Sequence, residues 1–315
     1  MHVPRLSRAR FLAALPLAAA AAGRAVAQPA LLPIHIGAAP TDSFAEAYYA
    51  RAMGFFEKAG LAAEIQSLGN GAAIAAGIAS GALDVGISSV NTLANGAIHG
   101  VPFVYIAGGG MYDSNRPTIV LAVAKDSPFT DPRSFEGGSI AVTGIKDVTH
   151  LAVSAYLVQN GVDLTKVRFI EMPMPEMGPA MRRGTIAAGI IAEPTLSGAS
   201  NDVRTFAKAY DAIARRMMIS GWFATSDWYA RNTVVAKRFI SAIYETARWA
   251  NRNRERSGAI ITEVAKLPAA TVSRMTRVTY AESLDAAMID PTLEMAARLK
   301  FTERLVKASE VMIAG

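Results

Sequence analysis

The sequence predicts an α/β fold made of two lobes, and three observations lead to this prediction. From Ile34 onward, short β-like runs alternate with helical stretches, which is the pattern of parallel βαβ units. The chain has 315 residues, of which 51% are hydrophobic, so it is long enough to form two hydrophobic cores. The composition becomes loop-like at residues 125–128, where we expect the chain to cross from the first lobe to the second.

The N-terminal segment has the three zones of a cleaved secretory signal. Arginines near its start precede an apolar run at residues 11–22, and Ala25-Val26-Ala27 stands directly before Gln28. The alternative of a membrane anchor is disfavoured, because a dozen residues are too short to span a hydrocarbon core of about 30 Å. We therefore expect export to the periplasm and a mature protein that begins at Gln28.

The elements of the first lobe follow in order. Residues 34–38 are predicted as the first strand and residues 45–59 as a helix. Gly60 ends this helix, because glycine readily adopts the left-handed conformation that closes one. The next elements alternate in the same way: a strand at 63–67, a helix at 72–80, a strand at 85–87, a helix at 90–100 and a strand at 103–107.

A long strand at 118–124 leads to the crossing. The second lobe is predicted to contain a strand at 139–142, a helix at 149–160, a strand at 167–171, a helix at 176–183 and a strand at 188–192. Residues 222–225 return the chain to the first lobe, which two amphipathic helices at 233–254 and 293–307 complete. The predicted division is a signal segment at 1–27, a first lobe at 28–124 plus 222–315, and a second lobe at 125–221.

The charge of the chain does not indicate a nucleic-acid partner. The 32 basic and 26 acidic residues give a formal charge of +6, but four arginines precede residue 28, which leaves 28 basic against 26 acidic residues, or +2. The densest basic stretch, residues 252–256, is interrupted by Glu255 and is typical of a solvated helix face.

The sequence lacks the patterns that support chemistry on a ligand. It contains no cysteine, which excludes disulfides, thiolate metal sites, cysteine nucleophiles and a lipid-modified cysteine. The four histidines have no metal-binding spacing. No G-x-S-x-G, Walker-type or S-x-x-K motif is present. We therefore expect no cofactor, no metal and no enzymatic activity.

Four sequence segments, taken together and in order, resemble those of one family. They are YARAMGFFEKAGL at 49–61, the small-residue helix and strand at 71–86, FEGGSIAV at 135–142 and RGTIAAGIIAEP at 183–194. Their order and spacing resemble the NMT1-like solute-binding proteins of the nitrate, sulfonate, taurine and thiamine-precursor transport type, from about residue 34 to beyond residue 298. One departure is Ala187, which stands where the family usually has aspartate.

The resemblance implies a type II periplasmic-binding-protein fold, in which two lobes are joined by two crossings and the ligand lies in the inter-lobe cleft. It also implies a monomeric periplasmic protein that delivers a small molecule to the permease and ATPase of an ABC transporter. In open α/β sheets, ligands lie beyond the carboxyl ends of the strands. There the helix N-termini carry about half a positive charge. Such a cleft suits a carboxylate, a sulfonate or nitrate.

Candidate ligand-binding residues of the first lobe follow the predicted strands. Helix capping is an equal alternative for the residues at helix starts, whereas the two serines would be neutral donors to an anion. The candidates are Thr41, Asp42, Ser43, Asn70, Gly71, Ser88 and Ser89. Gly110 would allow close backbone approach or a flexible loop, and Tyr112 would stack on an aromatic ligand.

The second lobe and the return crossing contribute four more candidates. Thr143 and Lys146 are the preferred contacts, although Lys146 could instead pair with Asp147 on the surface. Glu193 would bind an amino or amidine group or serve as a hinge contact. Trp222 fits a core or hinge aromatic better than a ligand wall. The serines and Lys146 favour a small organic anion, while a cationic or aromatic heterocycle stays open.

Two other functions stay open. One is an enzyme on the same fold, similar to a thiamine-pyrimidine synthase. That chemistry relies on a cysteine-rich segment and an active-site histidine, and this chain has no cysteine and carries an export signal. The other is a ligand-sensing partner of a membrane receptor, which the sequence does not separate from a transport protein.

Overall fold

The computed structural model describes residue 1 and residues 30–313. The predicted signal segment at 1–27 and its cleavage site lie outside the described residues, apart from Met1. The chain from Leu31 onward forms one compact unit. Among the described residues, none of the helices has the length and apolar character needed to cross a membrane.

The first sheet has five strands in the order β2-β1-β3-β12-β4. They are β1 (Leu32–Ala38), β2 (Leu61–Ser67), β3 (Val85–Ser88), β4 (Phe103–Gly108) and β12 (Gly221–Thr225). β1 pairs in parallel with β2 and β3, whereas β12 inserts antiparallel between β3 and β4. The helices that pack around this sheet include α1 (Glu46–Ala52), α3 (Gly71–Ala79), α4 (Val90–Ile98) and α9 (Thr233–Arg252).

The second sheet also has five strands, in the order β10-β6-β9-β7-β8. They are β6 (Ile119–Ala124), β7 (Ser139–Val142), β8 (Arg168–Glu171), β9 (Ala188–Ala192) and β10 (Val203–Ala207). The helices of this part are α5 (Val148–Gln159), α6 (Met174–Arg182) and the short α7 (Thr195–Gly198). β7 is buried along its whole length, as expected of a strand covered on both faces.

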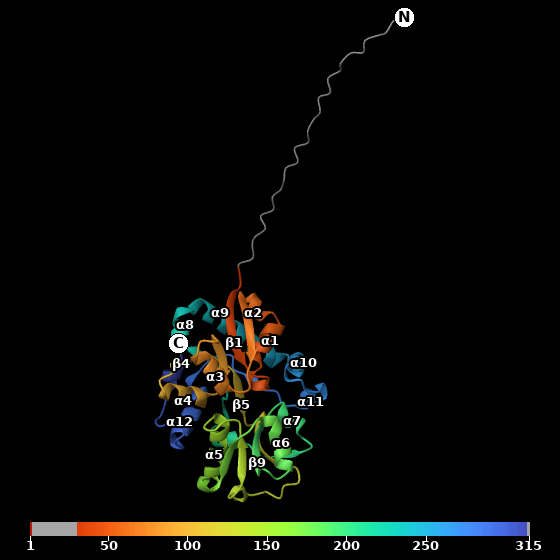
Figure 1. Ribbon diagram of the computed structural model, residues 1–315, viewed down its shortest axis with the longest axis vertical. Coiled ribbons are helices and arrows are strands. Elements are labelled where there is room, and N and C mark those ends of the chain that lie inside the picture. The colour runs from red at the N-terminus through yellow and green to blue at the C-terminus, as the bar shows by residue number, and fades with distance from the viewer. Residues whose placement is uncertain (2–29, 314–315) are drawn as a thin grey trace. The chain divides into compact units, whose positions relative to one another are not determined.

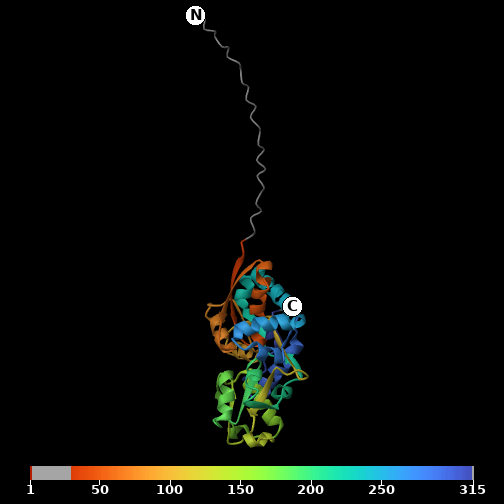
Figure 2. The same cartoon turned by 90° about the vertical axis from the view of Figure 1, so that its right-hand side faces the viewer.

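A small antiparallel sheet joins the two parts, in the order β11-β5-β13. β5 (Gly110–Asp113) belongs to the outward crossing, β11 (Arg216–Met218) to the return crossing and β13 (Thr279–Tyr280) to the C-terminal region. Figure 1 shows β5 between the two groups of elements, and Figure 2 shows the N-terminal and C-terminal thirds of the described chain together in one group. We call this three-stranded unit the hinge sheet.

The remaining helices are short or C-terminal. They are α2 (Phe55–Lys58), α8 (Ser226–Arg231), α10 (Arg254–Ala265), α11 (Ala269–Arg274), α12 (Asp290–Arg298) and α13 (Ala308–Val311). Single 3-10 turns lie at Asp42–Phe44, Pro132–Phe135, Leu164–Lys166, Ala209–Ala212 and Ala286–Met288.

Two helix predictions were wrong in their extent. The helix expected at 45–59 is divided into α1 and α2, because Gly54 adopts a left-handed conformation with φ of 69°. The helix expected at 293–307 ends at Arg298, and Lys300 follows with φ of 58°. Both predictions relied on apolar periodicity, which does not reveal a local left-handed residue.

The strand at Ile119–Ala124 lies in the second sheet, between β10 and β9. We expected it to end the first lobe. The predicted lobe boundary at residue 124 stays a prediction, and the sheet membership favours an earlier position, before Ile119.

Helix α3 packs closely on the first sheet where two strands carry glycine. A Cβ on Gly37 would stand 2.8 Å from Ile74 Cγ2, and a Cβ on Gly86 would overlap the same methyl group. Ile74 is fully buried, so it has no free space into which it could move. The two glycines therefore set how closely α3 approaches β1 and β3.

We expect Gly86→Ala to lower the free energy of unfolding by about 1–3 kcal/mol, because the added methyl group overpacks the contact with Ile74. Urea unfolding followed by circular dichroism measures the change. Gly69→Ala is the matched control, since nothing lies within 4 Å of its Cβ position. The control should stay within about 0.5 kcal/mol of the parent. Equal effects of the two substitutions would contradict a tight contact between α3 and the sheet.

Candidate functional site

The candidate site begins at the carboxyl end of β3. Ser88 is the last residue of this strand, is fully buried, and its hydroxyl has no hydrogen-bond partner among the described residues. A Cβ on Gly71, the first residue of α3, would overlap Ser88 Oγ. The structure therefore brings two predicted residues, Gly71 and Ser88, together where α3 begins. A buried polar group without a partner is rare in folded proteins, so this hydroxyl is a candidate ligand contact.

Two helices start beside this hydroxyl with uncharged caps. Asn70 Oδ1 accepts the backbone N–H of Ala73 at 2.9 Å at the start of α3. Ser89 Oγ accepts the N–H of Thr92 at 3.3 Å at the start of α4. Neither helix has an acidic residue in its first turn. The partial positive charge of both N-termini is therefore not neutralised by the chain itself.

The second part of the chain presents a loop that is capped differently. Asp147 caps α5, because its Oδ1 accepts the N–H groups of Thr149 at 2.8 Å and His150 at 2.9 Å. Thr143 Oγ1 donates to the other carboxylate oxygen. Burial raises the pKa of Asp147, and the hydrogen bonds from Thr143 and Thr149 oppose that rise. A carboxylate thus already occupies the N-terminus of α5, which makes it a poorer anion site than α3 or α4.

Lys146 lies in this loop and meets α4. Its carbonyl oxygen accepts the side-chain amide of Asn91, which is fully buried, and that of Asn95 at 3.4 Å. The Lys146 side chain is exposed, and it makes no ion pair with Asp147 among the described residues. Asn91 Oδ1 has no partner in this part of the chain. The predicted residues Ser89 and Lys146 therefore stand on elements that touch each other.

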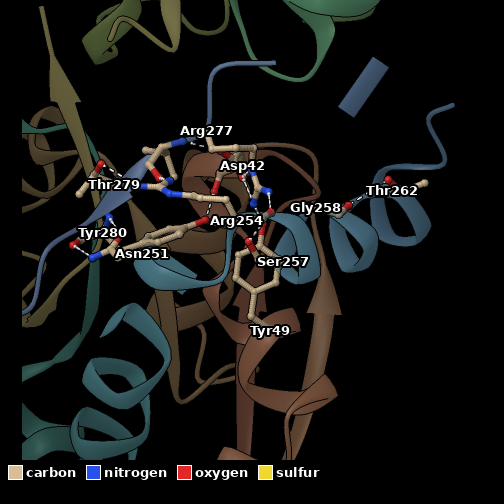
Figure 3. Close-up of polar contacts among 11 residues, drawn as sticks. Asp42, Tyr49, Asn251, Arg254, Ser257, Gly258, Thr262, Arg277, Thr279 and Tyr280 are labelled. Carbon is tan, nitrogen blue, oxygen red and sulfur yellow. Dashed lines mark hydrogen bonds and ion pairs between the residues drawn. The ribbon is translucent and has the colours of Figure 1, made fainter. Parts of the chain in front are cut away.

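Asp42 is the centre of a buried polar network (Figure 3). It is 1% exposed, and its Oδ1 accepts Arg277 Nε at 3.0 Å and Arg277 Nη2 at 2.9 Å. Oδ1 also accepts the Tyr49 hydroxyl at 3.1 Å, and Oδ2 accepts the backbone N–H of Val278 at 2.6 Å. Tyr280 donates its hydroxyl to the Asp42 carbonyl oxygen. The carboxylate of Asp42 is thus bonded within the protein on both oxygens.

Arg277 completes this network. Its Nη2 donates to the Tyr49 hydroxyl at 2.8 Å and its Nη1 to the Arg254 carbonyl oxygen at 2.8 Å. Burial alone would lower the pKa of Arg277, but the charge of Asp42 and its hydrogen bond to the guanidinium outweigh it and raise the pKa above its ordinary value. A buried pair of this kind needs both partners, because each compensates the desolvated charge of the other.

Other predicted residues bond to protein groups near the hinge sheet. Ser220 Oγ donates to the Ser43 carbonyl oxygen at 2.7 Å and accepts the Gly110 N–H at 3.0 Å. Thr41 is half-buried and makes no capping bond with its side chain. Tyr112 is fully buried and donates to Asp211 at 2.7 Å.

Glu193 links the second sheet's region to the C-terminal region. Its carboxylate accepts the Ser197 N–H at 3.0 Å, the Ser197 hydroxyl at 2.9 Å and the Thr276 N–H at 3.3 Å. Burial raises the pKa of Glu193, and the bonds from Ser197 and Thr276 counteract part of that rise. This geometry agrees with the expected alternative of a hinge contact.

Trp222 lies in the core and donates a hydrogen bond to a buried acidic side chain. Its Nε1 donates to Glu46 Oε2 at 2.8 Å, while Glu46 Oε1 has no partner among the described residues. Both side chains are fully buried. Burial raises the pKa of Glu46 well above its ordinary value, and the Trp222 bond only partly opposes this rise. Burial therefore favours the protonated, neutral form of Glu46 over its carboxylate.

Sequence reasoning missed several residues that organise the site. Arg277, Glu46, Ser220, Asn91 and His150 were not among the candidates. The role of each residue depends either on a partner that is distant in the sequence or on its burial in the fold. Neither of these leaves a motif in the sequence. The one available indication was that Asn91 lies in the first turn after Ser89.

No group of three or more His, Cys, Asp or Glu side chains that could hold a metal ion occurs within residues 30–313.

Two helix-covered sheets joined by crossings define a two-lobed binding-protein fold, which solved structures share. The periplasmic aliphatic sulphonate binding protein SsuA from Escherichia coli has a TM-score of 0.73 and 18% identity, over 90% of this chain and 98% of that chain. The nitrate-binding protein NrtA from Synechocystis PCC 6803 has a TM-score of 0.73 and 13% identity, over 87% and 83%. The ligand-binding component of an ABC-type import system from Staphylococcus aureus, solved with zinc bound, has a TM-score of 0.77 and 13% identity, over 89% and 96%.

The chain belongs to the NMT1/THI5-like family, whose model matches residues 41–257. No curated protein matches the chain in sequence. The expected family and two-lobed fold are thus confirmed. The names of the three structural neighbours describe binding proteins.

We expect Asp42→Asn to lower the free energy of unfolding by about 3–5 kcal/mol, because it leaves the charge of Arg277 buried without compensation. Urea unfolding measures the loss. Glu245→Gln is the control, because it breaks the exposed ion pair of Glu245 with Lys58 at 2.6 Å. The control should cost no more than about 1 kcal/mol. If Asp42→Asn costs no more than the control, the network does not stabilise the fold.

Glu46 predicts a pH-dependent stability. The pKa of Glu46 is higher in the folded state than in the unfolded state. Its contribution to the free energy of unfolding is therefore fully present below the unfolded pKa and is lost as pH rises towards the folded pKa. Glu46→Gln keeps an acceptor for Trp222 and cannot ionise. We expect this variant to gain stability relative to the parent as pH rises from about 5 to about 8, in urea unfolding at each pH. A difference that is constant with pH would show that Glu46 is ionised in the core.

Proposed function

We propose that this chain is a periplasmic solute-binding protein, exported by a cleaved signal at residues 1–27, that delivers a small organic molecule to the permease and ATPase of an ABC importer. Its family and the binding proteins that share its fold support this proposal. We further propose that the protein is monomeric and handles its solute without chemical change.

The buried hydroxyl of Ser88 carries the proposal for the ligand. It has no partner among the described residues, and it lies where α3 begins, one residue before the cap of α4. An anionic ligand group would accept from this hydroxyl and from the first N–H groups of the two helices, which have no partners within the helix. The neutral caps Asn70 and Ser89 leave the helix charge available. A carboxylate or sulfonate group fits these donors better than a cation does.

The two parts of the chain are proposed to be lobes that close on the solute. We place the first lobe before Ile119 and after the return crossing at Gly221, and the second lobe between them. The hinge sheet contains one strand from each crossing, so a rotation about it would separate the two large sheets without unfolding either.

The proposed contacts with the solute are those candidates whose polar groups lie at the facing ends of the lobes. They are Asn70, Gly71, Ser88, Ser89, Thr143 and Lys146. The side chains of Asp42, Tyr112, Glu193 and Trp222 already bond to other groups of the protein. Their contact with a solute, like that of Thr41, Ser43 and Gly110, stays a prediction.

A thermal-shift screen of residues 28–315 tests the proposal, with alkanesulfonates, taurine, nitrate, aromatic carboxylates and thiamine precursors as probes. A probe at about 100 times its dissociation constant should stabilise the protein by roughly 2.7 kcal/mol, a shift of several degrees. The probe should also be recovered with unchanged mass. Turnover of a probe, or no shift with any of them, would contradict a transport role.

Ser88→Ala then tests the site with whichever probe binds. We expect it to weaken binding about tenfold, the loss of one hydrogen bond to a charged group, with no loss of stability in the free protein. Ser80→Ala, at the other end of α3, is the matched control. Isothermal titration measures both constants, and equal affinities of the two variants would place the ligand elsewhere.

A further inference from the structure

The backbone of Lys146 is held from both sides, through its N–H and through its carbonyl oxygen. Its N–H donates to His150 Nδ1 at 3.0 Å, within its own loop and helix. Its carbonyl oxygen accepts the side-chain amides of Asn91 and Asn95, which stand on α4 of the other sheet's region. Lys146 adopts a left-handed conformation with φ of 65°, which is unfavourable for a residue other than glycine. Surrounding bonds must therefore hold the residue in this conformation.

His150 is placed to supply one of these bonds. Its ring packs against Phe169 of β8 at 4.2 Å and against Phe301, which follows α12, at 4.7 Å between ring centroids. Because Nδ1 accepts the Lys146 N–H, the imidazole is neutral and carries its proton on Nε2. The ring therefore cannot turn away freely, and its acceptor nitrogen is directed at the loop.

The same ring lies at a seam between the two regions. The first residues of α5 pack on the end of α12, where Leu151, Ala296 and Phe301 form one apolar cluster. The two regions are therefore joined here by two types of contact, an apolar contact beside His150 and a polar contact through Lys146. The apolar contact does not depend on direction, whereas the polar contact requires one orientation of the Lys146 carbonyl group.

We propose that His150 is a positioning residue that holds the backbone of Lys146 through its N–H, so that the loop at 143–147 presents the Lys146 carbonyl oxygen to Asn91 and Asn95 of α4 and holds the two lobes closed. The proposal rests on the proposed function, because docking of this loop is what would cover Ser88 with the second lobe. His150 itself touches no solute when the lobes close in this way.

The proposal has a pH-dependent consequence. Burial and the charge of Lys146 lower the pKa of His150 to about 4. Protonation makes Nδ1 a donor, so the bond to Lys146 is lost. Because the closed state binds one proton fewer than a state with a free imidazole, closure should weaken as pH falls from about 6.5 towards about 4.

Other charged groups lie on the elements that pack against the ring. The loop carries Lys146 and Asp147, β8 carries Arg168 and Glu171, and Lys300 precedes Phe301. Glu193 is a further titrating group in the contact with Thr276. A variant that lacks only the imidazole therefore has to serve as the reference for the effect of pH.

The absence of native cysteine permits a direct measurement of closure. Spin labels on Gln66→Cys in β2 and Glu176→Cys in α6 occupy exposed positions, one in each lobe. Pulsed electron resonance on the full mature chain without any solute then gives the populations of short and long inter-lobe distances. His150→Phe keeps an aromatic ring and removes the acceptor. His150→Asn keeps an acceptor near the Nδ1 position and cannot titrate.

We expect His150→Phe to lower the ratio of short to long distances about fivefold, the effect of one hydrogen bond, and His150→Asn to restore it. Between pH 7 and pH 4.5 the ratio of the parent should fall by up to about tenfold per pH unit below 6.5, whereas the ratio of His150→Asn should change less. Equal ratios for parent, His150→Phe and His150→Asn at both pH values would overturn the proposal.

Two further measurements separate the positioning role of His150 from a loss of folding and from a failed transport role. Asn91→Ala removes the donor from the opposite lobe, and its effect should not add to that of His150→Phe, since both break the same contact. Additive effects would overturn the proposal, and circular dichroism identifies a variant that fails to fold. If no solute in the thermal-shift screen changes the parent's distances, the transport role fails, while the dependence of the ratio on His150 and Asn91 still decides the positioning role.

Discussion

The ion pair between Asp42 and Arg277 joins segments that are 235 positions apart in the chain, and the hinge sheet depends on it. Asp42 follows β1, and Arg277 stands two residues before β13, whose Tyr280 pairs with Gly110 of the outward crossing. The next residue after Arg277 donates its backbone N–H to the same carboxylate. The charge pair thus fixes the segment that leads into β13, the third strand of the hinge sheet. Removing one partner leaves a buried charge, so the network behaves as a unit.

Differences in helix capping distinguish the two sides of the proposed site. The helices α3 and α4 have the neutral caps Asn70 and Ser89, whereas Asp147 places a carboxylate on α5. In the proposed function, an incoming anion would therefore be attracted to the first lobe, where no internal carboxylate competes with it. The second lobe is proposed to contribute contacts through its loop and to close over a ligand that the first lobe already holds.

The alternation of strands and helices was sufficient to predict most elements near their observed positions, including β7, β9 and the helix starts at Asn70 and Ser89. Periodicity failed where one residue adopts a left-handed conformation, as at Gly54 and Lys300. It also failed to assign Ile119–Ala124 to a sheet, because an apolar strand pairs equally well with either core. Four candidate site residues, Gly71, Ser88, Ser89 and Lys146, lie on elements that meet, and their contact with a solute stays a prediction. The partners Arg277, Asn91 and His150 were missed, since their roles depend on contacts between distant segments.

The sequence by itself determined the class of fold, the family and the positions where helices begin, because these follow from local periodicity, capping residues and the order of short phrases along the chain. Only the tertiary structure decided which polar side chains remain available to a solute. Asp42 and Glu193 are acidic residues of the kind that often bind ligands, yet Arg277 and Thr276 bond to their carboxylate oxygens. Ser88 is left without a hydrogen-bond partner among the described residues. Hydrogen-bond capacity is shared among groups that folding brings together, and the sequence does not record how it is divided.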